Sequence, residues 1–260
     1  MNAFTITSSK RLSLFEKTIN SFVDKCQDLD QIKVILHYDD CSSAEDRQRM
    51  SRIMAEKFKG KTILNRYFYP DSFVGAKRHM EIMKLWKMDL ENLGITYAFH
   101  TEDDFLYIQP FSITEGIELL QKMETVAYVG YSQPIRTLPA DFGQTNIIEG
   151  NFWKWIYDKN KKHCENLFMD FEAMKIYHDT YGDLSYWCYF INWPYFSFRP
   201  GIHEVNKLKT LNTFVDNGGS FEFEFSLRFA EKYCSYCHIR NIAIHIGSGN
   251  SSYNLNESLR

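Results

Sequence analysis

The sequence predicts an α/β fold with a mostly parallel sheet, because β-rich runs and helical segments alternate over the first hundred residues. Three strand–helix pairs follow one another and lead into a fourth strand. Crossover helices of this kind place successive strands in parallel and cover both faces of the sheet. The chain has 260 residues, enough to bury the core of such a fold. We therefore expect a single domain over residues 1–260.

The expected elements follow from the spacing of apolar residues. Short runs of β-branched and aromatic residues indicate strands, whereas apolar residues that recur every three or four positions indicate helices. In the first half the expected strands are residues 3–7, 32–36, 62–69 and 95–100, and the expected helices are residues 12–23, 44–58 and 80–90. In the second half we expect strands at 126–130, 195–198 and 239–246, a helix at 223–233 and irregular structure over 136–185.

The bulk composition argues against several classes of protein. The net charge is -3, without the basic excess that nucleic-acid binders usually have, so we expect no nucleic-acid partner. No apolar run is long enough to span a bilayer or to form a signal peptide. The six cysteines form no dense framework, which indicates reduced thiols in a cytoplasmic protein.

Polar side chains follow three of the expected strands, at the end where open α/β sheets bind ligands. Residues 8–11 come after the first strand, residues 39–42 after the second and residues 102–104 after the fourth. One site at this edge of the sheet would gather hydroxyl, cationic and acidic groups.

Three consecutive acids, Glu102, Asp103 and Asp104, end a buried strand and are followed by apolar residues. Carboxylates this close repel one another, and a divalent cation relieves the repulsion because hard cations favour carboxylate oxygens. Such a cation can also bridge to a diphosphate and act as a Lewis acid on the leaving group. A solvated acidic turn, with Asp103 capping the next segment, is the alternative that the triplet alone leaves open.

These segments resemble the glycosyltransferases of the GT-A fold, in particular family-2-like members. The acidic triplet resembles their DxD motif, and residues 4–12 resemble their first strand and nucleotide loop. Residues 38–43 resemble their D-D-x-S segment, and residues 75–79 resemble their G-x-x-x-A-R-N helix start, with His79 in place of Asn. The resemblance covers residues 3–108 well and the rest of the chain only in patches.

The resemblance implies a role for each matching residue. Thr7 and Arg11 border the nucleotide, Asp39 faces the base, Arg78 lies near the diphosphate, Glu102 and Asp103 approach the ribose and the metal, and Asp104 binds the metal. It also implies a nucleotide-sugar-binding half over residues 1–108 and an acceptor-binding half over residues 109–260. Two alternatives stay open: Arg78 could be an exposed helix residue, and Asp40 could cap the second helix.

Residues 221–228 resemble the E-D-x-D-L-S-L-R element of family-2 enzymes, with Phe221 in place of the first acid. Direct displacement at an anomeric carbon needs a base that takes the proton of the acceptor hydroxyl. Alignment on the Ser-Leu-Arg end puts Glu222 at the base position, with Glu224 as the reserve. The alternation with Phe predicts that both acids share one face of an extended segment. An edge with exposed glutamates is the alternative.

Residues 244–247 place a histidine at the end of a late strand. The segment resembles the C-terminal region of many GT-A enzymes, which implies that His245 binds the metal beside Asp104. A lone histidine in an apolar strand is more often a satisfied structural residue. A zinc site built on Cys234 and Cys237 lacks the second ligand pair that structural zinc usually has.

A cluster of aromatic side chains in the second half could line an acceptor-sugar pocket or simply pack the sheet. The residues concerned are Trp187, Tyr189, Trp193, Tyr195 and Phe196.

The predicted function is metal-dependent transfer of a sugar from a nucleotide-diphosphate donor, above all a UDP-sugar, to a glycan or other hydroxyl acceptor. We expect Mn²⁺ or Mg²⁺ as the cofactor and inversion at the anomeric carbon. One rival is a nucleotidyltransferase acting on a sugar phosphate, although its usual glycine-rich loop is replaced here by residues 8–11. The other is a catalytically idle carbohydrate-binding protein with the same fold, which the loss of the first acid at Phe221 favours.

Overall fold

A computed structural model of the chain describes residues 1–68, 76–132, 186–188, 196–215, 221–238 and 242–247. The strands are β1 (Asn2–Ser8), β2 (Val34–Asp40), β3 (Thr62–Phe68), β4 (Tyr97–Glu102), β5 (Phe105–Tyr107), β6 (Val126–Gly130), β7 (Tyr186–Cys188), β8 (Gly201–Glu204), β9 (Cys234–His238) and β10 (Ala243–His245). The helices are α1 (Leu12–Lys25), α2 (Ala44–Lys57), α3 (Ala76–Asn92), α4 (Ile113–Lys122), α7 (Val205–Lys209) and α8 (Phe221–Ala230), with a 3-10 turn η1 (Leu29–Gln31).

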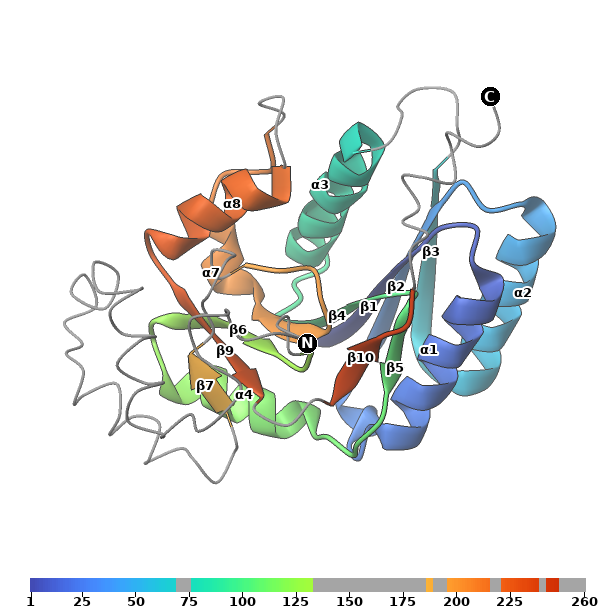
Figure 1. Cartoon of the computed structure of the whole chain (residues 1–260), viewed down its shortest axis with the longest axis horizontal. Coiled ribbons are helices and arrows are strands. Elements are labelled where there is room, and N and C mark those ends of the chain that lie inside the picture. The colour runs from blue at the N-terminus through green and yellow to red at the C-terminus, as the bar shows by residue number, and fades with distance from the viewer. Residues whose placement is uncertain (69–75, 133–185, 189–195, 216–220, 239–241, 248–260) are drawn as a thin grey trace, which may run out of the picture.

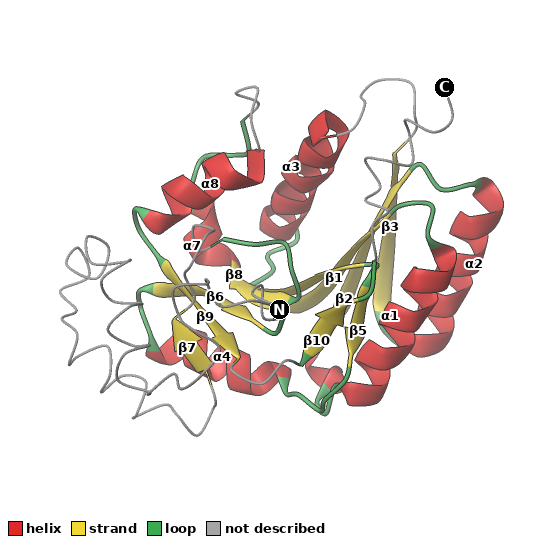
Figure 2. Ribbon diagram, viewed as in Figure 1, coloured by secondary structure: helices red, strands yellow, loops and turns green. Residues whose placement is uncertain are grey.

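The central sheet has eight strands in the order β3-β2-β1-β4-β8-β6-β9-β7. Strands β3, β2, β1 and β4 run parallel, β9 runs parallel to β6, and β8 is antiparallel to both β4 and β6. Helices cover both faces, with α1 and α2 on one side and α3 and α8 on the other (Figures 1 and 2). The predicted α/β class with a mainly parallel sheet is confirmed.

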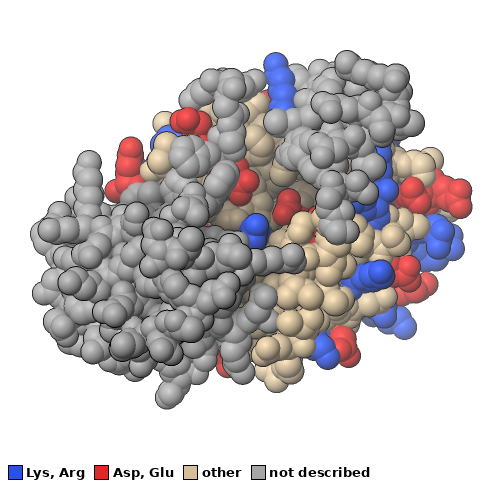
Figure 3. All heavy atoms as spheres, in the orientation of Figure 1, with Lys and Arg blue, Asp and Glu red and all other residues tan. Residues whose placement is uncertain are grey.

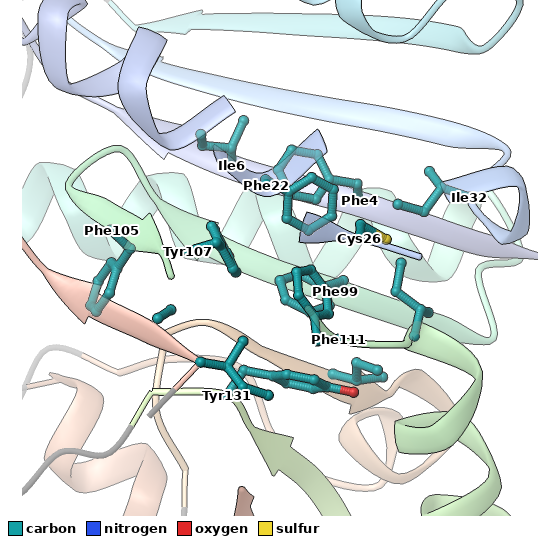
Figure 4. Packing of buried hydrophobic residues seen from close by; sticks show 14 of the residues in the cluster. Phe4, Ile6, Phe22, Cys26, Ile32, Phe99, Phe105, Tyr107, Phe111 and Tyr131 are labelled. Carbon is teal, nitrogen blue, oxygen red and sulfur yellow. The ribbon is translucent and has the colours of Figure 1, made fainter. Parts of the chain in front are cut away.

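A separate hydrophobic core fills each side of the sheet, because successive residues of a strand point to opposite faces. On β1, Ala3 belongs to the core that also contains α3 and α8 residues, whereas Phe4 and Ile6 belong to the core of α1, α2 and α4. Figure 4 shows the second core, where the ring of Phe22 lies 4.3 Å from that of Phe4 and 5.2 Å from that of Phe99. These two cores hold the ends of β1, β2 and β4 side by side.

The elements predicted for the first half are present with shifted boundaries. The second strand ends at Asp40 instead of residue 36, because its last residues are buried although they are polar. His37 has no exposed surface, and its ring nitrogens meet the hydroxyl of Ser8 at 2.8 Å and the amide oxygen of Asn65 at 3.0 Å. Hydrogen bonding therefore extends this strand beyond the point where the hydrophobic pattern stops.

In the second half, the strand predicted over residues 195–198 is wrong. Residues 196–200 are not a strand, and β8 instead begins at Gly201, where a Cβ would lie 2.2 Å from the ring of Tyr128. Of the strand predicted over residues 239–246, the structure describes residues 242–246, and β10 forms the strand there at Ala243–His245. It pairs with β5 in a second sheet, whereas β9, which was not predicted, belongs to the central sheet.

Helix α4 was not among the predicted elements, although the sequence carries a start signal for it. The Ser112 hydroxyl accepts a hydrogen bond from the amide of Glu115 at 3.2 Å, which is half of an S-x-x-E capping box. Ile117 and Leu120 then bury one face of the helix in the core.

No helix in the described part of the chain is long and apolar enough to cross a membrane. Lys, Arg, Asp and Glu side chains are interspersed over α1 and α2 on the face that Figure 3 shows. The expectation that nucleic acid is not a partner stays a prediction.

Asp28 ties η1 to the start of α4, and its removal should destabilise the protein. Its carboxylate accepts hydrogen bonds from the amides of Ile113 and Thr114, at 2.8 and 2.7 Å, and from the hydroxyl of Ser112 at 2.8 Å. We expect Asp28→Ala to lower the free energy of unfolding by roughly 1–3 kcal/mol, measured by urea denaturation, because these donors lose their partner. Asp24→Ala, which changes an exposed acid on α1, is the matched control.

The contribution of Asp28 should also depend on pH. Burial acts to raise the pKa of this carboxyl, but the hydrogen bonds from residues 112–114 outweigh it and lower the pKa below its usual value. A lowered pKa in the folded state gives stability that is present above the unfolded pKa of about 4 and is lost as the pH falls further. An unchanged unfolding midpoint in Asp28→Ala at pH 7 would contradict this role.

Candidate active site

A hollow opens to solvent at the carboxyl ends of β1, β2 and β4. Its lining combines hydroxyl, cationic, acidic and aromatic groups: Thr7, Ser8, Ser9, Arg11, Asp40, His79, Ile82 and Glu102. Three residues predicted from the resemblance, Thr7, Arg11 and Glu102, therefore lie around one space. His79 and Ile82 were not predicted; both come from α3, and only the position of that helix against the sheet brings them here.

The acidic turn between β4 and β5 lies beneath this hollow. Asp103 has no exposed surface. Its carboxylate accepts a hydrogen bond from the amide of Ser9 at 3.0 Å and forms an ion pair with Arg11. Burial raises the pKa of Asp103 to about 7, and Arg11 opposes that rise while Asp104 adds to it. The backbone oxygen of Asp103 also accepts a bond from Thr18 at 2.9 Å. Asp103 thus joins the turn to the loop and helix that follow β1.

Asp104 and His245 come together although 141 positions separate them in the sequence. Oδ2 of Asp104 lies 3.0 Å from Nε2 of His245, and the backbone oxygen of Asp104 accepts a hydrogen bond from the amide of Ile246 at 2.8 Å. The antiparallel pair of β10 and β5 produces this contact by placing His245 opposite Phe105. The structure therefore brings together the two residues that the resemblance implies as metal ligands.

Arg11 occupies the position before α1 and points back to the acids. Its Nη1 lies 2.7 Å from Oδ2 of Asp104, and its Nη2 pairs with Oδ1 of Asp103. Lys10, just before it, has a φ of 53°, in the left-handed region that L-residues seldom adopt. The amide of Lys10 donates to the hydroxyl of Ser42 at 2.9 Å, which holds this conformation. The loop after β1 is therefore fixed to the loop after β2.

Asp39 has no exposed surface and organises the loop after β2 from within. Its carboxylate accepts hydrogen bonds from Nε of Arg47 at 2.8 Å, from the amide of Ser42 at 3.1 Å and from the hydroxyl of Ser8 at 3.1 Å. The residue of this loop that lines the hollow is Asp40. The predicted contact of Asp39 with a base stays a prediction, since its carboxylate does not reach the hollow in this structure.

Arg78 and Asp40 form a nearly buried ion pair between the start of α3 and the end of β2. Only 5% of Arg78 is exposed, so the alternative of an exposed helix residue is wrong. The alternative that Asp40 caps α2 is also wrong, because the hydroxyl of Ser43 accepts the bond from the amide of Asp46 at 3.1 Å. Asp40 is therefore left to face the site.

Glu222 lies at the start of α8, and electrostatic repulsion links it to Glu102 at the end of β4. Burial raises the pKa of Glu102 well above its usual value, and the charges of Asp104, Glu222 and Asp103 raise it further. Burial also raises the pKa of Glu222 to about 7, against a lowering by the amide of Phe198, which donates to its carboxylate at 3.2 Å. The charge of an acid from the second half of the chain therefore acts on Glu102, which lines the hollow.

The prediction that Glu222 and Glu224 share one face of an extended segment is wrong, because both lie in the first turn of α8. Residues two apart in a helix point in directions roughly 200° different. The alternation of acids with Phe resembles a strand, but Phe221 and Phe225 are buried at the four-residue spacing of a helix face. Burial raises the pKa of Glu222, whose charge in turn raises that of Glu102.

Asp104 and His245 fit a divalent cation. Oδ1 of Asp104 is buried and has no hydrogen-bond partner among the described residues, and a buried carboxylate oxygen left unpaired is costly. A carboxylate suits Mn²⁺ or Mg²⁺, and an imidazole is a common transition-metal ligand. Within the described part of the chain no group of three or more His, Cys, Asp or Glu side chains could hold a metal ion. Of the ligands that such a cation would need, the described residues therefore supply these two.

Gly247 lets the chain pass directly against Asp104, and adding a methyl group there should disturb the site. A Cβ at Gly247 would lie 2.4 Å from Oδ2 and 3.0 Å from Cβ of Asp104, closer than real contacts allow. We expect Gly247→Ala to weaken Mn²⁺ binding about tenfold, measured by calorimetry, because a displaced ligand loses much of its affinity. Gly60→Ala is the control for backbone strain away from the site, because its φ of 76° disfavours Ala while its Cβ would meet nothing within 4 Å. Equal Mn²⁺ affinity in both variants would contradict this prediction.

Comparison with protein-family models and with curated proteins gives no match. Among solved structures, the chain is similar to the mannosyltransferase PcManGT from Pyrobaculum calidifontis in complex with GDP-Man and Mn²⁺, with a TM-score of 0.57 and 11% identity. That similarity covers 98% of this chain and 59% of PcManGT.

The chain is also similar to residues 1–349 of TarS from S. aureus, with a TM-score of 0.50 and 9% identity over 91% of this chain and 60% of that one. The same part of TarS in complex with UDP has a TM-score of 0.50 and 11% identity, with the same coverage. The chain thus spans less than two thirds of these structures.

The chain has the GT-A glycosyltransferase fold. In this GT-A fold the order β3-β2-β1-β4 brings the residues that follow β1, β2 and β4 together at the carboxyl ends of these strands. Of the aromatics considered for an acceptor pocket, Phe196 is fully buried and packs 4.6 Å from the ring of Phe225, so it belongs to the core. Tyr189, Trp193, Tyr195 and the side chain of Trp187 lie outside the described residues.

Proposed function

We propose that the chain is a metal-dependent glycosyltransferase that moves a sugar from a nucleotide-diphosphate donor, a UDP-sugar in the first instance, to an acceptor hydroxyl. The observation that carries this proposal is that two residues lining the hollow, Arg11 and Glu102, connect it to the acids and the histidine. Arg11 pairs with Asp104, which lies 3.0 Å from His245, and the charge of Glu222 raises the pKa of Glu102. In this reading, metal ligands and a base lie near one space in a GT-A fold. Groups fixed in this way would stabilise the charge that develops in the transition state of the transfer.

On the donor side, residues of the loops after β1 and β2 would hold the nucleotide. Thr7 and Arg11 line the hollow and would border the nucleotide, with Asp39 setting the shape of the loop beside the base. Arg78 is proposed to act near the diphosphate, and its ion pair with Asp40 fixes its position at the start of α3. Glu102 and Asp103 would lie nearest the ribose and the metal.

Asp104 and His245 are the residues proposed to hold Mn²⁺ or Mg²⁺. When bound, the cation would supply positive charge to the diphosphate oxygens of the leaving group. The orphaned Oδ1 of Asp104 supports this role, because the protein offers it no other partner among the described residues.

On the acceptor side, Glu222 is proposed to take the proton of the attacking hydroxyl, with Glu224 as the reserve candidate. A pKa raised to about 7 suits a general base that works near neutral pH, since the proton acceptor is then both present and strong. A single base without a separate nucleophile favours inversion at the anomeric carbon.

A nucleotide-release assay over a panel of UDP- and GDP-sugars, with a mixture of glycan acceptors, tests this proposal. We expect Mn²⁺-dependent release of one nucleotide, absent with chelator and strongly reduced in Glu222→Gln. Release of pyrophosphate from a sugar phosphate and a nucleoside triphosphate would instead indicate a nucleotidyltransferase. Binding of carbohydrate without any nucleotide binding would indicate the catalytically idle alternative.

A further inference from the structure

Arg11 lies among the same carboxylates that the proposed function assigns to the nucleotide and the metal. Its guanidinium bridges Asp103 and Asp104, and only 14% of its side chain is exposed. It meets Oδ2 of Asp104, the same oxygen that lies 3.0 Å from Nε2 of His245. Two donors therefore already converge on one oxygen of Asp104, and the other oxygen has no partner in the described part of the chain.

The charge of Arg11 works against a cation at this turn. Asp103 and Asp104 together carry two negative charges when ionised, and the guanidinium leaves a net charge of -1 for an incoming cation to meet. The guanidinium also repels a divalent ion placed at Asp104, and repulsion between charges a few ångströms apart near a protein surface is strong. A cation alone should thus bind weakly here.

A nucleotide diphosphate changes this balance because it carries negative charge of its own. Arg11 lines the hollow as well as contacting the acids, so one guanidinium faces both the carboxylates and the space for the donor. Its planar fork of donors suits phosphate oxygens as well as it suits carboxylates. A diphosphate in the hollow would therefore neutralise Arg11 and add oxygen ligands for the metal at the same time.

Building on the proposed function, we propose that Arg11 couples the two ligands: it holds the affinity of the acidic turn for a divalent cation low until a nucleotide diphosphate binds. Arg11 is thus a positioning residue that makes cation and donor bind together. Thermodynamic linkage requires the coupling to be reciprocal, so the cation must strengthen nucleotide binding by the same factor.

The test measures Mn²⁺ binding to the full chain without nucleotide, by the loss of the free-ion signal in electron paramagnetic resonance. We expect Arg11→Gln to bind Mn²⁺ about tenfold more tightly than the wild type, the order expected when a unit charge is removed from beside a divalent ion. Arg11→Lys keeps the charge and should stay near the wild type. Arg66→Gln is the matched control. It removes an arginine of β3, three strands from β4, that pairs with Asp89 of α3.

A second arm repeats the titration with saturating UDP or GDP. The ratio of the Mn²⁺ affinities with and without nucleotide should fall about tenfold in Arg11→Gln. If Arg11→Gln unfolds more readily, because two buried acids are left together, Mn²⁺ should raise its melting temperature more than it raises that of the wild type.

Mn²⁺ affinity in Arg11→Gln that equals or falls below that of the wild type and Arg66→Gln would overturn the role of Arg11. The first arm uses no nucleotide, so it separates this inference from the donor proposal. Tighter Mn²⁺ binding in Arg11→Gln, combined with no nucleotide binding in any variant, would confirm the effect of Arg11 on the cation but contradict the coupling and the proposed transferase.

Discussion

Glu222→Gln should lower the turnover number about 10²- to 10⁴-fold while the nucleotide affinity stays at the wild-type level. The amide keeps the size of the carboxylate and can accept the bond from the amide of Phe198, but it cannot take a proton from the acceptor. Steady-state kinetics together with nucleotide titration measures both quantities. Glu224→Gln is the matched control, because it removes an equal charge from the same turn of α8 and should change turnover much less.

The pH dependence of the reaction rate also tests Glu222 as the base. Burial raises the pKa of Glu222 to about 7, so the carboxylate form that acts as a base is lost as the pH falls below that value. We expect the rate of the wild type to rise with pH up to about 7 and then to level off. A large loss of activity in Glu224→Gln, with Glu222→Gln still active, would show that the reserve residue is the base.

Asp104→Asn should weaken Mn²⁺ binding about 100-fold or more and remove metal-dependent transfer. The substitution keeps one oxygen and the shape of the side chain but removes the charge that attracts a divalent ion. It also alters the carboxylate whose Oδ1 is buried without a hydrogen-bond partner among the described residues. Glu45→Gln, at an exposed acid in the first turn of α2, is the control for loss of one negative charge.

The measurement for Asp104→Asn is Mn²⁺ titration in the presence of nucleotide, followed by activity at increasing Mn²⁺. Activity that returns at high Mn²⁺ would fit a weakened site. Activity equal to the wild type with chelator present would contradict a role for Asp104 in holding a metal.

Most of the first half could be predicted from the sequence because its pattern is local. The helix over Leu12–Lys25 shows apolar residues at helical spacing, and the strand that ends in Glu102 is apolar until its last residues. Parallel packing then requires that the polar residues after these strands meet at one edge. The convergence of Thr7, Arg11 and Glu102 therefore follows from periodicity and topology alone.

The second half was harder because its determinants are distant contacts. The start of β8 depends on how Gly201 fits against the ring of Tyr128, which no local pattern reveals. Glu222 alternates with Phe as in a strand, yet the packing of Phe221 and Phe225 in the core selects a helix. The burial of Asp39, which changes how that residue can act, depends on Arg47 from a different element.

Calorimetric titration of the wild-type chain with UDP and with GDP, each with and without Mn²⁺, tests the proposed donor site most directly. We predict that one nucleotide binds much more tightly with Mn²⁺ than without it, and that Asp104→Ala loses this difference. Failure of both nucleotides to bind, with or without Mn²⁺, would contradict a nucleotide-sugar donor at the ends of β1, β2 and β4.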